Sequence, residues 1–237
     1  MTSRAAGPVL ELSDVSKDYR GLRPLRIASL ALRPGEHVAI LGLDQIAAEV
    51  LVNLVTGATL PERGDVRLFG RSTSAIADST DWLALVDRLG IVSRRAVLLE
   101  GLTVVQNLAM PFTLDLDPPP HDIGQRAVEL ARRVGLADAS LDRPVAELGP
   151  SGHARVRLGR ALALAPAIVL FEHPTAEMGR DDAVAFGVLC REVPAATVAL
   201  TADREFAEAA SGRCLTLDAA TGRLGDASAW FSRRRRG

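Results

Sequence analysis

The chain has 237 residues, of which 48% are hydrophobic and 24% are charged. These values fit a single domain over residues 1–237, and the formal net charge of -1 gives no reason to expect nucleic acid as a partner. The two cysteines, Cys190 and Cys214, are too few for a disulfide framework, and no stretch reaches the ~18 apolar residues of a membrane helix. The N-terminus lacks the apolar core of a signal peptide, so we expect a cytoplasmic protein that reaches a membrane only through a partner.

The first third of the chain predicts strands, a loop and one helix. Val9–Leu12 and Leu25–Leu32 alternate between apolar and polar residues, as half-buried strands do. Residues 38–42 form a short apolar run that ends in glycine, which is typical of a buried parallel strand before a loop. The following segment, Ala47–Val55, is rich in helix-forming residues, and Val66–Gly70 predicts a further strand.

The rest of the chain alternates helices with short apolar strands. A proline-rich segment, 116–120, separates an apolar stretch at 102–114 from the elements that follow it. The later predicted elements are helices at 123–134, 151–165 and 203–210, and strands at 167–171, 197–201 and 214–217. This alternation predicts an α/β fold with a mainly parallel sheet, followed by a basic tail at residues 229–237.

Five phrases in chain order resemble the ATP-binding subunits of ABC transporters over nearly the whole length. They lie at residues 35–42 (GEHVAILG), 53–57 with 64–66, 102–108, 155–162 and 174–176. The resemblance implies a P-loop NTPase fold of the ABC type. It would combine a mainly parallel core sheet, an N-terminal antiparallel β subdomain and an inserted α-helical subdomain at about residues 93–165.

The resemblance places a P-loop at residues 42–49, which read GLDQIAAE. A working P-loop has the pattern G-x-x-x-x-G-K-[ST] and binds phosphate through backbone N–H groups, a helix N-terminus and one lysine. Here Gly42 is retained, but Ala47 replaces the second glycine and Ala48 replaces the lysine. Glu49 stands where the hydroxyl that binds Mg²⁺ is expected.

These replacements predict a site whose affinity for ATP is millimolar or weaker. Lys17 is the only lysine in the chain, so no other lysine can substitute. Losing one charge-assisted hydrogen bond and adding a carboxylate beside phosphate removes on the order of 5 kcal/mol, or about three to four decades of affinity. Because carboxylates are favourable at a helix N-terminus, we expect Asp44 and Glu49 to supply the negative charge that ATP normally supplies.

The segment that resembles the Walker B strand ends in Glu172 and His173. In the family, the first of these two positions holds Mg²⁺ through water and the second carries the catalytic glutamate. Glu172 keeps a carboxylate, whereas His173 replaces the catalytic residue. A neutral histidine can act as a base, but phosphoryl transfer depends mainly on charge stabilisation that this site lacks. The alternatives are a polar residue at a strand end and a Glu172/His173 metal site with no further ligands in sight.

Other positions of the family pattern differ in the same direction. Arg94 aligns with the glutamine that senses the γ-phosphate, Ala202 with the switch histidine, and Gly179 with the aspartate of the D-loop. For Arg94 and Arg95 we expect a solvated pair. The alternatives are that they bind an anion, Glu49 or Glu172.

The family signature L-S-G-G-Q aligns with residues 148–152, which read LGPSG. Gly149 replaces the serine that faces phosphate, and Pro150 removes a backbone donor. Ser151 and Gly152, which stand at the second glycine and the glutamine of the pattern, could cap the following helix.

Tyr19, the only tyrosine, aligns with the aromatic residue that stacks on adenine. Stacking contributes on the order of 1–3 kcal/mol, which is too little to hold ATP alone. The alternative is an ordinary packed aromatic near a strand end.

Three functions follow from these residues. The first is a catalytically inactive structural or regulatory subunit that docks on a transmembrane permease, through the helical segment at about 93–148, and needs no cofactor. It would pair with an identical chain or with another ABC ATPase subunit. The second is an ATP- and Mg²⁺-dependent ATPase with an unusual site made of Glu49, Glu172, His173 and Arg94. The third is a partner-binding module unrelated to transport. Residues 98–111 faintly resemble subunits of lipid or lipoprotein exporters, but the sequence names no cargo.

Overall fold

The strands of the computed structural model, which describes residues 7–227, form two sheets. The smaller sheet is antiparallel in the order β2-β1-β4-β5, with β1 at Leu10–Lys17, β2 at Leu25–Leu32, β4 at Arg63–Leu68 and β5 at Arg71–Ser72. The larger sheet has the order β10-β9-β3-β8-β7-β6. Its strands are β3 (His37–Leu41), β6 (Leu89–Ser93), β7 (Ile168–Glu172), β8 (Ala196–Thr201), β9 (Arg213–Leu217) and β10 (Leu224–Asp226). All of its pairings are parallel except that of β10 with β9.

Seven α-helices connect and cover these sheets within the described residues. They are α1 (Gln45–Val55), α2 (Ser79–Val86), α3 (Val104–Ala109), α4 (His121–Arg133), α5 (Pro150–Leu162), α6 (Arg180–Arg191) and α7 (Arg204–Ala210). Short 3₁₀ turns lie at Thr73–Ala75, Asp138–Ser140 and Val145–Glu147. No helix of residues 7–227 is both long and apolar enough to cross a membrane.

The core has two apolar layers because the buried parallel strands send alternate side chains to opposite faces. In β3, Val38 and Ile40 pack with α1 and the antiparallel sheet, whereas Ala39 and Leu41 pack with the helices of the other face. The first layer therefore places α1 between the two sheets, and the second joins α3 to α7 over the opposite face.

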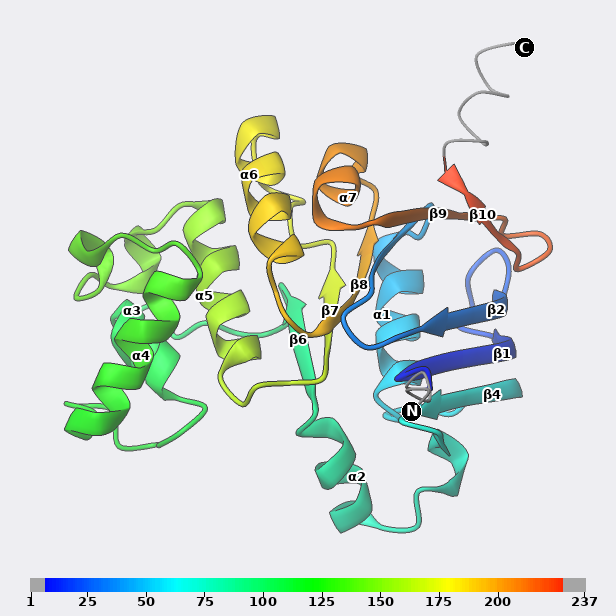
Figure 1. The fold of residues 1–237 in the computed structure, drawn as a ribbon, viewed down its shortest axis with the longest axis horizontal. Helices are drawn as coiled ribbons and strands as arrows, with labels where there is room; N and C mark the ends of the chain where they lie inside the picture. The colour runs from blue at the N-terminus through cyan, green and yellow to red at the C-terminus, as the bar shows by residue number, and fades with distance from the viewer. Residues whose placement is uncertain (1–6, 228–237) are drawn as a thin grey trace, which may run out of the picture.

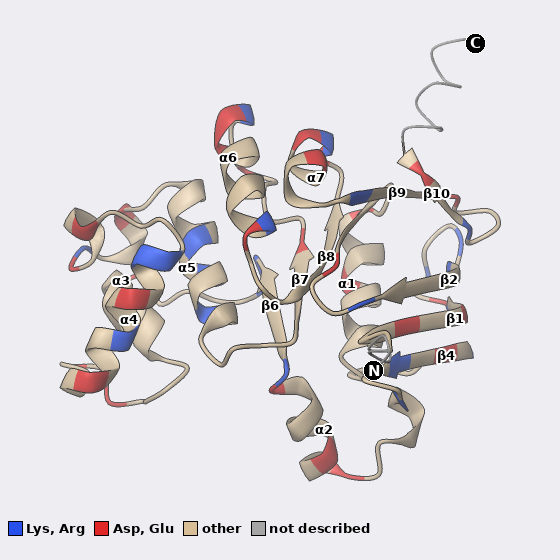
Figure 2. Cartoon of the chain, viewed as in Figure 1, with Lys and Arg blue, Asp and Glu red and all other residues tan. Residues whose placement is uncertain are grey.

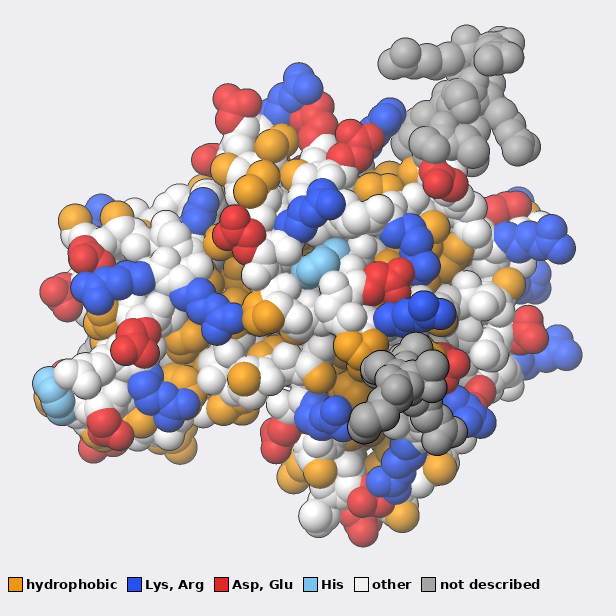
Figure 3. Space-filling model, viewed as in Figure 1, with side chains coloured by type: hydrophobic (Ala, Val, Ile, Leu, Met, Phe, Trp, Pro, Cys, Tyr) orange, Lys and Arg blue, Asp and Glu red, His pale blue; other side chains and the backbone are white. Residues whose placement is uncertain are grey.

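The helices α3, α4 and α5 gather at the β6 end of the larger sheet, while the antiparallel sheet lies toward its other end (Figure 1). Basic and acidic residues alternate along α4, as Figure 2 shows. The face seen in Figure 3 likewise mixes both signs of charge with hydrophobic side chains.

The expected fold class is confirmed: a mainly parallel sheet is combined with an antiparallel β sheet. Several boundaries differ from the prediction. The first strand runs on to Lys17 as β1, and β10 follows the strand that was expected to close the sheet. Helices α2 and α6 were not predicted; they bury only one and four of their residues, so little of each helix faces the core. The basic tail at 229–237 lies outside the described residues.

Candidate functional site

Four side chains meet where β6 and β7 end and α1 begins. Because β3, β8, β7 and β6 are parallel, their carboxyl ends lie at one edge of the sheet. The fully buried side chain of Glu172, the last residue of β7, accepts hydrogen bonds there from Gln45 Nε2 at 2.7 Å and from Arg95 Nη2 at 2.6 Å. Arg95 Nη1 also reaches Glu49 Oε1 at 3.3 Å. We call Gln45, Glu49, Arg95 and Glu172 the Glu172 cluster.

The local backbone directs Arg95 into this cluster. Ser93, at the end of β6, pairs with Glu172 in the sheet, and its hydroxyl accepts a hydrogen bond from the Arg95 N–H at 3.1 Å. The turn that follows β6 therefore carries the guanidinium back over the end of β7. Arg95 Nε completes the contact, lying 3.2 Å from each Glu172 carboxylate oxygen.

Charge pairing is what allows Glu172 to be buried. An isolated carboxylate away from water is strongly unfavourable, whereas one that accepts charge-assisted hydrogen bonds is tolerated. The hydrogen bond to Glu172 is the main cause that raises the pKa of Arg95, with the charges of Glu172 and Glu49 adding to it. Arg95 keeps 41% of its side chain exposed, so the guanidinium spans from the buried carboxylate to solvent.

The loop before α1 satisfies the helix N-terminus with its own carboxylate. Gly42 takes a left-handed conformation with φ of 94°, which favours glycine. Asp44 then acts as the N-cap, since its Oδ1 accepts a hydrogen bond from the Ala47 N–H at 2.7 Å. Ala47 and Ala48 are 5% and 0% exposed and belong to the core layer under α1. Asp44 therefore supplies negative charge at the N-terminus of α1, as the sequence predicted. Glu49 instead contacts Arg95.

The two neighbouring arginines have different partners, so the expected solvated pair is wrong for Arg95. Arg94 Nη2 pairs with Glu177 Oε1 at 2.7 Å, and both of these side chains are 53% exposed. Arg95 instead forms the partly buried contacts to Glu172 described above. The structure shows one of the alternatives for Arg95, which is pairing with Glu172 and Glu49.

His173 follows Glu172 but takes no part in the cluster. Its backbone has φ of 43°, a conformation that is uncommon outside glycine, and its N–H donates to the Leu200 carbonyl at 2.8 Å. Its Nε2 atom is buried without a hydrogen-bond partner among the described residues. Over residues 7–227 no group of three or more His, Cys, Asp or Glu residues could hold a metal ion, which leaves a Glu172/His173 pair without further ligands.

Comparison with known proteins identifies the family of this chain. Residues 25–176 match the family model described as ABC transporter. The chain belongs to the ABC transporter family. It is 33% identical over 174 residues to the lipoprotein-releasing system ATP-binding protein LolD of Pseudomonas fluorescens. The aligned residues cover 72% of this chain and 76% of that protein.

Solved ABC structures share the fold of this chain. It superposes on cbiO1 from Clostridium perfringens, part of the ABC transporter complex cbiONQ, with a TM-score of 0.77, 18% identity and coverage of 96% of this chain and 92% of that one. A second match is MJ0796, described as a bacterial ABC transporter cassette of dimeric structure, with a TM-score of 0.72, 21% identity and coverage of 91% and 96%.

The residues aligned with the ABC signature form the N-cap and the first turn of α5. Gly149 is the N-cap of α5 and Pro150 is its first residue, a position that suits proline. Ser151 and Gly152 therefore lie inside the first turn, so the expectation that they cap the helix is wrong. None of the hydrogen bonds or ion pairs of the Glu172 cluster involves residues 149–152.

Two further positions of the ABC pattern follow strands, one in each sheet. Ala202 comes directly after β8 and is exposed. Tyr19 follows β1, is partly buried and packs against the core layer that contains α1. Burial, and secondly the charge of Asp44, raise the pKa of Tyr19. Tyr19 therefore lies within electrostatic reach of the loop that the sequence named as the degenerate P-loop.

The sequence missed how Arg95 and Gln45 complete this cluster. Gln45 stood inside the degenerate P-loop without a role, and Arg95 was expected to be solvated. The signal was present, because Glu172 ends a buried strand and a buried carboxylate requires a partner. Which side chain supplies it depends on the turn after β6, which the sequence did not specify.

Proposed function

We propose that this chain is a subunit of an ABC-type membrane transport complex that has lost ATP hydrolysis and keeps a structural or regulatory role. The observation that carries the proposal is the contact of Arg95 with Glu172 and Glu49. In the family resemblance, these two carboxylates stand at the positions concerned with Mg²⁺. Here a side chain of the protein itself supplies the positive charge.

The residues present do not fit Mg²⁺. A magnesium ion needs oxygen ligands in near-octahedral geometry. At this site, both Glu172 oxygens already accept hydrogen bonds from Gln45 and Arg95. A bound Mg²⁺ would have to displace the guanidinium, and Arg95 would then place like charge beside the ion. We therefore assign no step of phosphoryl transfer to this site.

The phosphate side of the site also argues against ATP. Ala48 is buried at the position of the lysine, and the chain's only lysine, Lys17, lies in β1 with Glu62 Oε1 3.8 Å away. Asp44 already accepts from the first turn of α1, the helix end that would otherwise donate to phosphate. A triphosphate would therefore meet carboxylates where it needs donors.

A docking role is supported by a cleft of about 390 Å³ between the parallel sheet and the helical end of the molecule. It lies between the start of β6, the segment after α3 and the helix α5. Arg157 and Arg160 of α5 cross toward it and donate to the carbonyls of Ala96 and Val97, at 3.2 and 2.7 Å. Leu164, which lines the cleft, is 55% exposed, and Val97, which follows the lining residue Ala96, is 70% exposed. Apolar and basic groups in one cleft suit an inserted segment of a partner protein.

By analogy with the relatives, the partner is a transmembrane permease subunit, and the chain works at the cytoplasmic face of the membrane. LolD is named as the ATP-binding protein of a lipoprotein-releasing system, and cbiO1 as part of a transporter complex. The helical part at about residues 93–165 would carry the docking surface. A second cassette, identical to this chain or an intact ATPase subunit, would complete the dimer.

Equilibrium binding of labelled ATP with Mg²⁺ to the full chain tests the loss of activity. We expect no micromolar binding and no Mg²⁺-dependent phosphate release. Micromolar binding, or phosphate release that is lost in His173→Ala, would instead establish the alternative, an ATPase that uses Glu49, Glu172 and His173. The unpartnered Nε2 atom of His173 is the observation that favours this alternative.

Affinity purification of the tagged chain from a cell that expresses it with its natural neighbours tests the docking role. We expect a transmembrane subunit to be recovered with the wild-type chain. Recovery should decrease when the exposed Val97 and Leu164 are both changed to Asp, while the isolated variant keeps its thermal stability. Absence of any membrane subunit from the wild-type sample would favour a module unrelated to transport.

A further inference from the structure

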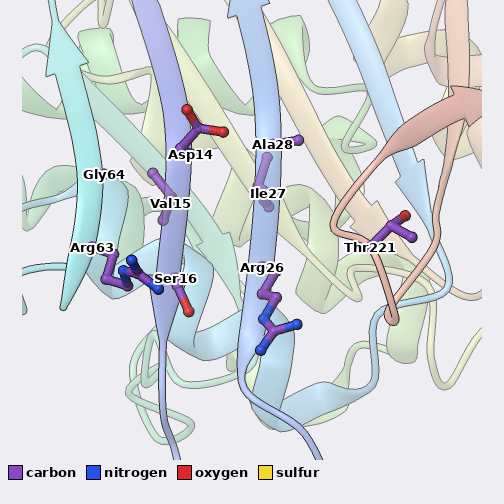
Figure 4. Close-up of a pocket in the computed structure, with 9 residues that line it drawn as sticks. All are labelled: Asp14, Val15, Ser16, Arg26, Ile27, Ala28, Arg63, Gly64 and Thr221. Atoms are coloured by element: carbon purple, nitrogen blue, oxygen red, sulfur yellow. The ribbon is translucent and has the colours of Figure 1, made fainter.

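The outer face of the antiparallel sheet contains a hollow of about 570 Å³, whose lining residues include no member of the Glu172 cluster (Figure 4). It opens across β2, β1 and β4 and is bordered on the β2 side by the loop before β10. We call it the outer-sheet hollow. The residues that matter to its chemistry are Asp14, Ser16, Arg26, Ala28, Arg63 and Thr221.

A β-bulge in β1 shapes this hollow. The register with β4 changes from Ser13 opposite Asp65 to Ser16 opposite Arg63, so Asp14 and Val15 together face Gly64. The extra residue is Asp14, whose φ is 49°, and it points outward while Val15 returns to the core at 1% exposure. Bulges redirect side chains and are frequent beside functional sites.

Small residues keep the part of the hollow beside Asp14 open. Ala28 on β2 and Gly64 on β4 border it with little or no side chain. Gly64 is also required by the backbone, since its φ is 82° and an added Cβ would lie about 2.4 Å from backbone atoms of Asp14 and Ser13. The two long side chains, Arg26 and Arg63, stand at the other end of the hollow.

Two arginines flank one hydroxyl at one end of the hollow. In the sheet, Ser16 pairs with Arg26 on one side and with Arg63 on the other. Neighbouring strands lie about 4.8 Å apart, so the two arginine Cα atoms stand about 10 Å apart with Ser16 between them. This spacing leaves room for one oxyanion within reach of both guanidinium groups.

These charges lack partners inside the part of the chain that the structure describes. The Arg63 side chain forms no hydrogen bond or ion pair there, and the one side-chain contact of Arg26 is a long one of 3.5 Å to the Ala220 carbonyl. The Asp14 carboxylate is likewise unpaired within residues 7–227, and Figure 4 shows it at the opposite end of the hollow from both arginines. The hollow therefore has a positive end and a negative end, each without a counter-charge.

We propose that the outer-sheet hollow binds an organic phosphate that also carries an ammonium group. The phosphate lies between Arg26 and Arg63 and accepts from the Ser16 hydroxyl, because guanidinium groups recognise phosphate oxygens with directed hydrogen bonds. The ammonium group faces Asp14. Phosphoethanolamine has this chemistry, either as a free molecule or as a lipid headgroup.

Isothermal titration of the full-length chain tests the proposal with two probes, inorganic phosphate and O-phosphoethanolamine. We expect phosphoethanolamine to bind more tightly than phosphate. Arg26→Ala and Arg63→Ala should each weaken the binding of both probes by about tenfold or more, the usual loss for one charge-assisted hydrogen bond. Arg67→Ala is the matched control, since Arg67 is on β4, pairs with Asp65 at 2.7 Å and does not line the hollow.

Asp14→Asn separates the two ends of the hollow. It should remove the preference for phosphoethanolamine and leave the affinity for inorganic phosphate unchanged or higher. Absence of binding at millimolar probe concentration, binding that persists in the Arg26→Ala/Arg63→Ala double variant, or equal affinity of the wild-type chain for both probes would overturn the proposal.

Co-sedimentation with vesicles of phosphatidylcholine, with and without phosphatidylethanolamine, distinguishes the two sources of the ligand. Binding that needs phosphatidylethanolamine and is lost in the double arginine variant assigns the hollow to a lipid headgroup. Binding of the free probe alone assigns it to a small molecule. Both outcomes support the proposal, and neither depends on whether the chain hydrolyses ATP.

Discussion

The Glu172 cluster and the outer-sheet hollow both contain arginine and carboxylate side chains. In the cluster these charges pair with one another, whereas in the hollow they do not. In the cluster, Arg95 binds both carboxylates, and Gln45 donates a further hydrogen bond. In the hollow, Arg26 and Arg63 stand at one end and Asp14 at the other, and their side chains form no ion pair among the described residues. A site that contains its own counter-charge is closed to a charged ligand, whereas one that lacks it is open.

Burial explains the difference between the two regions. Glu172 ends a strand that is buried on both faces, so its carboxylate must be paired within the protein. The hollow lies on the solvent side of an antiparallel sheet, where water hydrates unpaired charges at little cost. The fold therefore allows free charge in the hollow and forbids it in the cluster.

Gly64→Ala should give the largest loss in the free energy of unfolding, and it would change the shape of the hollow. A Cβ at this position meets the backbone of Asp14 and Ser13 at about 2.4 Å, and φ of 82° is unfavourable for alanine. We expect a loss of about 3 kcal/mol or more in the free energy of unfolding, because backbone strain and steric overlap add. Denaturant unfolding measures this loss.

Gly70→Ala is the matched control for that experiment. Gly70 has nearly the same backbone conformation, with φ of 81°, but open space around an added Cβ. It should cost about 1 kcal/mol from backbone conformation alone. If both variants lost the same free energy of unfolding, the β1 bulge opposite Gly64 would be able to move aside. The bulge would then not fix the shape of the hollow.

Arg95→Ala should have the second largest effect, because it leaves Glu172 buried with Gln45 as its remaining partner. We expect a loss of about 2 kcal/mol, less than for a fully buried pair since Arg95 is 41% exposed. Arg94→Ala is the control, and its exposed pair with Glu177 should contribute less than about 1 kcal/mol. If the two variants were equally stable, the cluster would not be held by Arg95.

Asp44→Ala tests whether the loop before α1 is stabilised by its own carboxylate. Removal of the N-cap should cost about 1 kcal/mol of stability. Asp44→Ser keeps a capping oxygen and should recover most of this stability, while it removes the negative charge. The pKa of Tyr19 should fall in both variants, because the charge of Asp44 helps to raise it. Tyrosine absorbance during an alkaline titration measures the pKa of Tyr19.

The smallest expected effect is on the pH dependence of stability. It concerns His37, which belongs neither to the Glu172 cluster nor to the outer-sheet hollow. Burial, and secondly the charge of Arg191, lower the pKa of His37 below its usual value of about 6.5. Between the folded pKa and 6.5 the unfolded chain binds more protons, so stability should fall as the pH decreases through this window. In His37→Gln the slope of unfolding free energy between pH 7.5 and 5.5 should be smaller. An unchanged slope would place the response elsewhere.

Much of the architecture could be predicted from the sequence because its signals are local. The apolar run before Gly42 and the strand ending at Glu172 both appear in the structure, since short buried parallel strands are apolar on both faces. Helix α6 was not predicted from the sequence, and the structure buries only four of its residues. Its helical form is stabilised by packing against α7 and the sheet.

The loss of the P-loop lysine was likewise readable from the sequence, because identity at one position of a short pattern needs no tertiary information. Ala48 and the solitary Lys17 are facts of composition and spacing. The partners of charged groups were not readable. Arg94 and Arg95 are adjacent and chemically identical, yet only Arg95 contacts Glu172.

The sequence by itself determined the α/β fold, the order of its segments and the residues missing from the nucleotide site. Only the tertiary structure decided which charges neutralise one another. Ion pairs join residues far apart in the chain, such as Arg95 with Glu172, and the choice between two neighbouring arginines depends on a single turn after β6. The unpaired charges of the outer-sheet hollow likewise depend on a bulge and on the register of three strands.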